Sequence, residues 1–274
     1  ARYFSPLLAL VLVVYNFQVI KVHLSKFWLG VVVAGICVLP IVPHLLSSQA
    51  RLRFAEVNIF TDSSIVTTAN DRIGVDGFAW WAKILHNRRV GYLRSYLIHF
   101  LDNLEPRFLF IKGDGNPKFS LQDVGELYLV EFPLLVAGIY WLLVKERAIF
   151  WILLFWLLAA IAPAATARET PHALRIENSL PTWQIFIAAG LLSVISHQSS
   201  VKKKLLLLVF IVIMYGGSFA YFWHHYFNHY ATEYSGEWQY GYREAVRFVS
   251  PLEAQYQQIV MSESIGRPYI YVLF

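Results

Sequence analysis

Long apolar runs separated by short polar linkers dominate the chain, and their lengths predict membrane-spanning helices. A helix needs about 20 predominantly apolar residues to cross a bilayer, where lipid offers its backbone no hydrogen-bond partner. Six runs approach or reach that length, and they cover residues 4–20, 27–46, 127–144, 148–165, 180–195 and 205–223. The fifth is the weakest because it is short and contains Gln184. The pattern predicts an all-α polytopic membrane protein with about six transmembrane helices.

The linkers between these runs predict the orientation of the helices. Cytoplasmic loops of membrane proteins carry an excess of Lys and Arg. Alternate linkers share this excess through Lys21, Lys26, Lys145, Arg147, Lys202, Lys203 and Lys204. The other side then receives a large loop at 47–126, a short loop at 166–179 and the chain from residue 224 onward. We therefore divide the chain into a transmembrane domain, 1–223, and an extracytoplasmic C-terminal region, 224–274.

The polar segments carry patterns of their own. Residues 78–100 alternate apolar and basic positions at helical spacing, which predicts one amphipathic helix lying in the membrane interface. In the C-terminal region, 242–249 reads as a helix, whereas 259–261 and 270–274 read as strands. These three elements predict the start of a small α/β extracytoplasmic cap. Both chain ends read as cut, so we expect this to be a fragment of a longer protein.

Composition agrees with a membrane location and excludes several classes of protein. Hydrophobic residues make up 57% of the chain and charged residues 15%, against about 45–50% and 25% in soluble domains. The net charge of +5 could favour nucleic acid, but three of the basic residues cluster beside an apolar run, as membrane topology requires. Cys37 is the single cysteine, which excludes a disulfide or zinc framework.

The short loop at 166–179 holds the strongest candidates for chemistry. Arg168, His172 and Arg175 fall within eight positions, and guanidinium groups suit phosphate because their fork of donors engages two oxygens at once. They are candidates for binding the phosphate of a lipid-linked substrate, although pairing with Glu169, Glu177 or lipid head groups explains them equally well. Glu131 is a further candidate for substrate binding, since an ionisable group at membrane depth is a functional hypothesis by default.

Other polar clusters favour structural interpretations, and no metal site is predicted. Asp114, Asn116 and Asp123 lack the acidic spacing of a calcium loop. His225 and His229 have zinc-ligand spacing, but aromatic rings surround them as in a membrane-interface belt. The carboxylates whose roles the sequence leaves open are Asp62, Asp71 and Asp76.

Several segments carry a resemblance to a known family. The segments "FLFIKGDGNPKFSLQDVGELYLVEFP" and "APAATARETPHALR", with "ARYFSPLLAL" and "VMSESIGRPYIYVLF" at the ends, resemble bacterial GT-C superfamily membrane glycosyltransferases. The branch is the dolichyl-phosphate-mannose protein mannosyltransferase-like group, related to aminoarabinose transferases.

The resemblance implies an inverting transfer of a sugar from a polyprenyl-phosphate donor to a protein, lipid or glycan acceptor, outside a bacterial plasma membrane. It places Arg168, His172 and Arg175 at the phosphate or sugar pocket, with the 47–126 loop as its cover. It also implies that the catalytic carboxylate lies upstream of Ala1, so we expect the fragment to be inactive alone. A transporter or flippase for lipid-linked sugars, or a non-catalytic membrane subunit, remains the alternative. The sugar, the acceptor, the oligomeric state and any divalent-metal requirement stay open.

Overall fold

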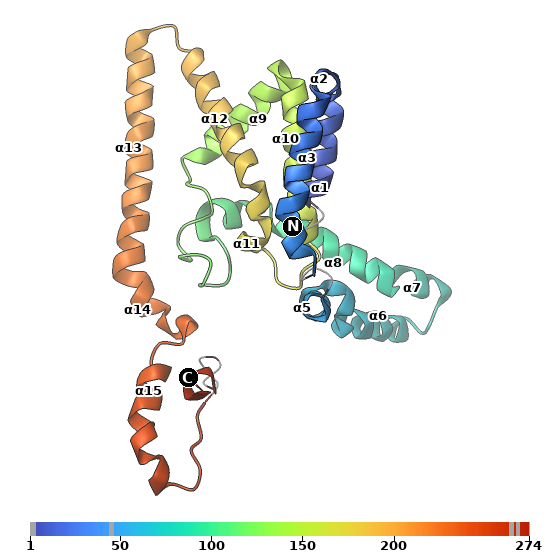
Figure 1. Cartoon of the computed structure of the whole chain (residues 1–274), viewed down its shortest axis with the longest axis vertical. Helices are drawn as coiled ribbons and strands as arrows, with labels where there is room; N and C mark the ends of the chain where they lie inside the picture. The colour runs from blue at the N-terminus through green and yellow to red at the C-terminus, as the bar shows by residue number, and fades with distance from the viewer. Residues whose placement is uncertain (1–3, 44–46, 263–265, 267–268, 274) are drawn as a thin grey trace.

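The chain folds mainly into helices (Figure 1). The structure, a computed structural model, describes residues 4–43, 47–262, 266 and 269–273. Within these ranges no strand forms, and the only β-bridge joins Asn58 to Ala167. The prediction of an all-α protein is therefore confirmed at the level of fold class.

The first predicted span is divided into two helices. α1 (Phe4–Tyr15) ends before Asn16, α2 (Phe17–Val22) forms the turn, and α3 (Leu24–Val38) runs back antiparallel to α1 before the single turn η1 (Leu39–Ile41). At 1.5 Å per residue, α1 covers about 18 Å, less than the bilayer core of about 30 Å. The structure therefore does not support a single spanning helix at 4–20. The end of the second predicted span, 44–46, lies outside the described residues.

The large polar loop contains an arm that projects from the lower end of the upright helices (Figure 1). Its elements in chain order are α5 (Ser48–Val57), η2 (Ile59–Thr61), α6 (Ser63–Val75), α7 (Trp80–Leu85) and α8 (Arg88–Asp102). The amphipathic helix predicted at 78–100 is thus two helices, because Asn87 is extended and its side chain accepts a hydrogen bond from Arg89 N at 2.9 Å. A capping Asn starts a new helix there and ends the previous one.

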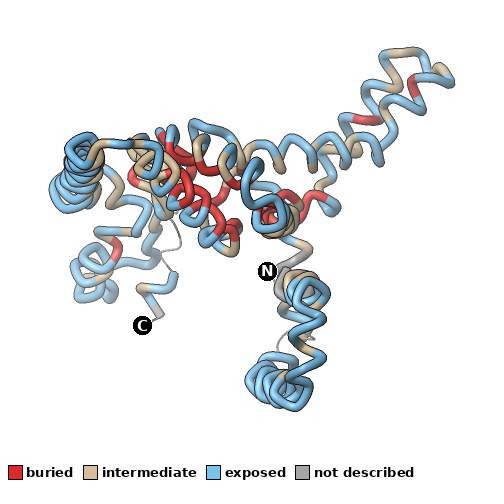
Figure 2. The backbone as a smooth tube through the Cα atoms, turned by 90° about the horizontal axis from the view of Figure 1, so that it is seen from above, coloured by how far each residue is buried: buried red, intermediate tan, exposed pale blue. Residues whose placement is uncertain are grey.

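The packed core lies between α9 (Glu131–Lys145), α10 (Arg147–Ala164) and α12 (Leu180–Ser196), with the turns η3 (Phe108–Lys112), α11 (Ala173–Ile176) and η4 (Glu177–Ser179) below them. Figure 2 shows the buried residues concentrated in this part of the chain. α9 and α12 approach most closely at Gly138 and Gly190: a Cβ on Gly138 would lie 1.8 Å from the carbonyl oxygen of Phe186. Small residues let membrane helices approach until their backbones touch.

The C-terminal part extends away from this core. α13 (Val201–His225) stands apart from α12 and continues through η5 (Tyr226–Tyr230), α14 (Ala231–Glu233) and η6 (Ser235–Trp238) (Figures 1 and 2). α15 (Tyr242–Val249), η7 (Ser250–Gln255) and α16 (Tyr269–Leu273) follow.

The helix predicted at 242–249 is confirmed, but the predicted strands are wrong. Residues 259–261 are irregular and 269–273 are helical. A strand needs a paired neighbour for its backbone groups, and no neighbouring strand is present among the described residues. The predicted α/β cap is therefore not supported.

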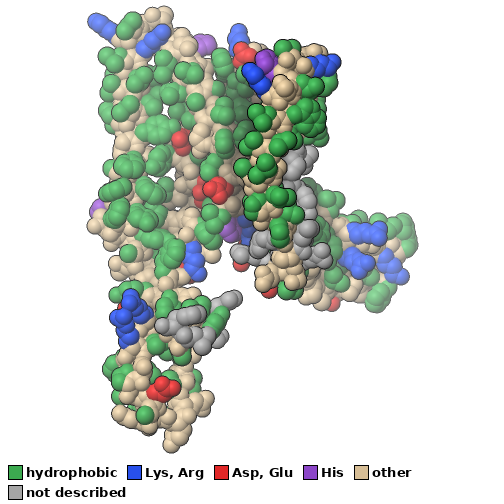
Figure 3. Space-filling view, viewed as in Figure 1, with side chains coloured by type: hydrophobic (Ala, Val, Ile, Leu, Met, Phe, Trp, Pro, Cys, Tyr) green, Lys and Arg blue, Asp and Glu red, His purple; other side chains and the backbone are tan. Residues whose placement is uncertain are grey.

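Four helical segments of the described chain are long and apolar enough to cross a membrane: Leu24–Ile41, Arg147–Ala164, Ala173–Ser196 and Val201–Glu233. α9 has only 15 residues, or about 22 Å, so the predicted count of six becomes four. Hydrophobic side chains cover the visible surface of these helices (Figure 3). The basic turns α1–α3, α9–α10 and α12–α13 lie at the same, upper end (Figures 1 and 3). The structure is that of an all-α protein with four candidate spanning helices.

Candidate functional site

Asp114 joins two loops that are far apart in the chain. It lies in the Gly113–Gly115 turn and is 3% exposed. One carboxylate oxygen accepts a hydrogen bond from Asn116 N, and the other from Ala173 N, both at 2.8 Å. The Gln122 side chain donates to the Asp114 carbonyl at 2.6 Å. A buried carboxylate is stable only when hydrogen-bonded or paired in this way, so Asp114 fixes the turn against the loop at 166–179.

His172 lies against the same carboxylate. Its Nδ1 is 3.3 Å from Asp114 Oδ2 without the alignment of a hydrogen bond, and its ring contacts Phe119 in a tilted arrangement, with centroids 4.8 Å apart and planes at 36°. Burial lowers the pKa of His172, and nearby Arg175 lowers it further, against the opposing effect of Asp114 and Glu169. This shift favours the neutral ring, in which one nitrogen accepts a hydrogen bond while the other donates one.

The loop that carries His172 is held from two further directions. Thr170 donates to Asp102 Oδ2 at 2.8 Å, and His172 N donates to the fully buried Asn103 at 3.2 Å. Both partners lie at the end of α8. Their bonds connect the projecting arm to the candidate site.

Arg168 and Arg175 point to different partners. Arg168 Nε donates to the Asn58 carbonyl at 3.0 Å and Nη2 to Thr61 Oγ1 at 3.1 Å, beside the β-bridge between the two segments. Arg175 Nη1 donates to the Glu169 carbonyl at 2.6 Å. The structure brings His172 close to Arg175, but the side chains of Arg168, His172 and Arg175 do not converge on one point. Their role in binding phosphate stays a prediction.

Glu131 lies elsewhere, at the start of α9. Its two oxygens accept hydrogen bonds from Tyr128 N at 2.7 Å and from the Tyr215 hydroxyl of α13 at 3.0 Å. It closes the first turn of its own helix, as an acidic residue at a helix N-terminus favours, and it ties α9 to the separate α13. Its predicted role in substrate binding is not tested by these contacts.

A polar cleft of ≈ 460 Å³ opens between the 114–117 turn and the 168–172 segment. Its ionisable lining consists of Asp114, Arg168, Glu169, His172 and Glu237. Carboxylates and a neutral imidazole suit hydroxyl-bearing ligands, since carboxylates accept and imidazole both donates and accepts. The described residues hold no group of three or more His, Cys, Asp or Glu placed to bind a metal.

Glu126 borders a second, apolar pocket of ≈ 250 Å³, lined in part by Leu109, Leu174, Leu180 and Trp183. Burial raises the pKa of Glu126 to about 7, Asp114 also raises it, and a hydrogen bond with the Asp114 backbone opposes the shift. Phe119, whose ring contacts that of His172, also lines this pocket. The sequence analysis missed Glu126 and gave Asp114 only a structural interpretation, as part of an ordered turn. Their position in one segment that carries the resemblance, at 108–133, was the available signal.

The remaining candidates have structural partners. Asp123 Oδ2 lies 3.0 Å from His225 Nε2, so its partner is His225 and not a calcium-binding loop shared with Asp114. Asp62 caps α6 by accepting from Ser64 N at 2.9 Å, and Asp76 lies 3.1 Å from His86. His229 lies 3.9 Å from Glu233, and Asp71 is exposed.

No family model, no curated protein and no solved structure matches this chain.

Proposed function

We propose that the chain is part of an inverting glycosyltransferase that moves a sugar from a polyprenyl-phosphate donor to an acceptor at the membrane surface. One observation carries the proposal. The two segments with the most distinctive resemblance, around Asp114 and around His172, are interlocked by the Ala173 N–Asp114 Oδ2 hydrogen bond. They lie beside helices of membrane-spanning length, where a donor with a lipid tail would present its phosphate.

Each part of the substrate has a matching surface. The carboxylates of the polar cleft suit the hydroxyl groups of the sugar, and Arg168 in its lining suits the phosphate. The apolar pocket beside Glu126 suits the first isoprene units of the lipid. His172 lines the polar cleft and its ring partner Phe119 lines the apolar pocket. We propose that a ligand that is polar at one end and apolar at the other extends past this pair of rings.

In the proposed reaction an acceptor hydroxyl oxygen forms a bond to the anomeric carbon while the bond from that carbon to the phosphate oxygen breaks. The phosphate leaves with the bonding electron pair, and a base takes the hydroxyl proton. Two cations of the 166–179 loop are the candidates to stabilise the leaving phosphate: Arg168, which lines the polar cleft, and Arg175, whose ion pair with Glu169 is long, at 3.9 Å. By the resemblance, the base is a carboxylate upstream of Ala1.

A transporter is the less favoured function. Transporters place broken helices near the bilayer midplane. In the described chain, Pro163 lies in the last turn of α10 and the wide turn η5 follows the end of α13. These interruptions lie at helix ends.

The test uses membranes that contain the full-length gene product, supplied with polyprenyl-phosphate mannose or polyprenyl-phosphate aminoarabinose labelled in the sugar. We expect label to leave one of these lipids, and Arg175→Ala to slow this by about a hundredfold. Arg147→Ala, an exposed arginine at the start of α10, is the matched control and should retain the rate. The proposal is wrong if neither donor is consumed, or if Arg147→Ala and Arg175→Ala lose activity equally while both proteins keep the wild-type melting temperature.

A further inference from the structure

The arm formed by α6, α7 and α8 contains a cleft away from the Asp114 site. α6 and α8 lie side by side and are closest at Gly91, where a Cβ would be 2.9 Å from Ile65 Cγ2. Beyond this contact the helices enclose an open cleft of ≈ 510 Å³. The cleft is lined by both helices and by the 85–87 turn.

The arm also exposes several large apolar side chains to solvent. Val75 is 87% exposed and Trp80 is 76% exposed, and the other large exposed apolar residues include Phe78, Ile84, Leu85, Leu93 and Leu97. Basic and hydrophobic side chains share the visible face of the arm (Figure 3). An element with Trp and Leu on one part of its surface and Arg on another lies in the membrane interface, which agrees with its sideways projection from the upright helices (Figure 1).

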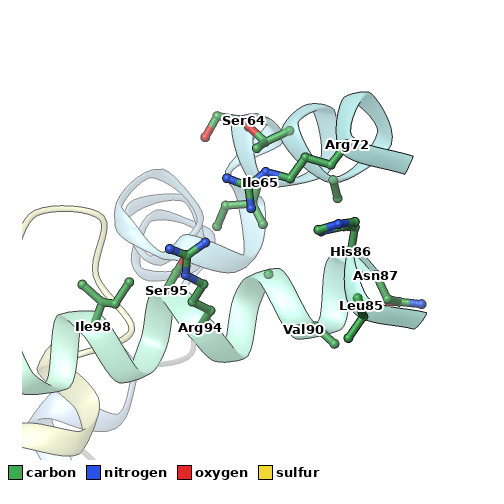
Figure 4. Close-up of a pocket in the computed structure, with 13 residues that line it drawn as sticks. Ser64, Ile65, Arg72, Leu85, His86, Asn87, Val90, Arg94, Ser95 and Ile98 are labelled. Carbon is green, nitrogen blue, oxygen red and sulfur yellow. The ribbon is translucent and has the colours of Figure 1, made fainter. Parts of the chain in front are cut away.

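Two arginines from opposite helices extend into the cleft. Arg72 of α6 and Arg94 of α8 direct their guanidinium groups into the gap between the two helices (Figure 4). Neither side chain has a hydrogen bond or an ion pair with any residue that the structure describes. The hydroxyls of Ser64, Thr68 and Ser95 also line the cleft.

The charge balance of the cleft selects for an anion. No Asp or Glu is among its lining residues, all of which are described, whereas the cleft at Asp114 has three carboxylates. His86, at one end, already lies 3.1 Å from Asp76. Two unpaired guanidinium groups with hydroxyl donors around them match the oxygens of a phosphate, which guanidinium binds with two parallel hydrogen bonds.

We infer that this cleft binds the phosphate of an anionic membrane phospholipid, with Arg72 and Arg94 on the phosphate oxygens. The exposed apolar residues of the arm contact the acyl chains of the same lipid layer. Binding would fix the arm in the plane of the interface. Since the end of α8 holds the 170–172 segment through Asp102 and Asn103, the lipid would also steady one wall of the Asp114 cleft. The inference does not depend on the proposed transfer reaction.

The test measures lipid binding by the full-length protein purified in an uncharged detergent. Phosphatidylglycerol is added, and bound lipid is counted by native mass spectrometry. We expect Arg72→Gln with Arg94→Gln to weaken phosphatidylglycerol binding by about tenfold or more. The matched control is Arg88→Gln with Arg89→Gln, which removes the same charge from exposed arginines outside the cleft and should bind as the wild type does.

Two results would overturn the inference. Equal loss in the two double variants would show that general surface charge attracts the lipid. Displacement of phosphatidylglycerol by an equal concentration of inorganic phosphate would show a site for a soluble anion. Both pairs of arginine side chains lack structural partners, so we expect both double variants to fold. Circular dichroism spectra and melting curves that match between the two variants would verify this.

Discussion

The crossing of α9 and α12 is the most sharply defined packing contact in the molecule, and it predicts the effect of adding one methyl group. Gly138→Ala places a Cβ 1.8 Å from the Phe186 carbonyl oxygen and within 2.8 Å of Gly190 N. Both neighbours are helix backbone, which cannot rotate away as a side chain can. Restoring an ordinary contact of 3.4 Å requires the two helices to separate by about 1.6 Å.

This separation affects the surrounding core. A radial gap of about 0.5–1 Å already forfeits a quarter to a half of each dispersion contact. Buried side chains along the crossing include Leu134, Leu142, Phe186 and Ala189. Overpacking of this kind costs about 1–3 kcal/mol and occasionally more, and Ala regains up to about 1 kcal/mol over Gly in helix propensity. Because the clashing atoms are backbone, we take the upper end of that cost, about 3 kcal/mol, and expect a net loss of about 2 kcal/mol for Gly138→Ala. We expect a similar loss for Gly190→Ala, whose Cβ would lie 1.9 Å from the Leu134 carbonyl oxygen.

The assay is unfolding of the detergent-solubilised protein by titration with sodium dodecyl sulfate, followed by circular dichroism. Gly216→Ala in α13 is the matched control, because a Cβ at Gly216 meets nothing within 4 Å. The control should unfold at or above the wild-type denaturant fraction and Gly138→Ala well below it. If the two variants differ by less than about 0.5 kcal/mol, which is the usual range for neutral surface changes, the close crossing of α9 and α12 is not present in the folded protein.

Two further predictions concern the candidate site. Asp114→Ala removes the acceptor for the N–H groups of Asn116 and Ala173, which costs about 1–3 kcal/mol for each buried donor left unpaired. Hydrogen exchange at 113–117 and 172–176 should therefore rise, whereas the control Asp71→Ala, at an exposed residue, should change exchange at neither segment. Unchanged exchange in Asp114→Ala would contradict the interlock. For Glu126, burial raises the pKa from 4.5 to about 7, so the folded state keeps a proton that the unfolded state loses, and stability should fall as pH rises from about 4.5 to 7. Glu126→Gln should remove this part of the pH dependence of the melting temperature, and an unaltered profile would show that Glu126 is not buried as described.

Helix formation was predictable where the cause is local. The apolar runs that became α10 and α13 are long and uninterrupted, and even the weaker run at 180–195 formed α12. The start and end of α15 agree with the predicted 242–249. Residues 269–273 were less predictable because a short apolar run is compatible with strand or helix, and only its surroundings decide between them.

The candidate site was predictable in location but less so in detail. The 166–179 loop was selected from its Arg and His residues, and it does form the wall of a polar cleft. The orientations of Arg168 and Arg175 depend on Asn58, Thr61 and Glu169. Two of these partners are more than 100 positions from Arg168, and such contacts leave no mark in the local pattern.

By itself the sequence determined that this is a helical membrane-type protein, since lengths and apolar runs dictate how a backbone satisfies its hydrogen bonds in lipid. Only the structure showed which runs form helices long enough to span. It showed that α1 ends before Asn16 and that α9 begins at Glu131, so both helices are short. It also decided that Asp114 and His172 meet and that Arg72 and Arg94 enter one cleft. Contacts between segments distant in sequence are set by packing of the whole chain.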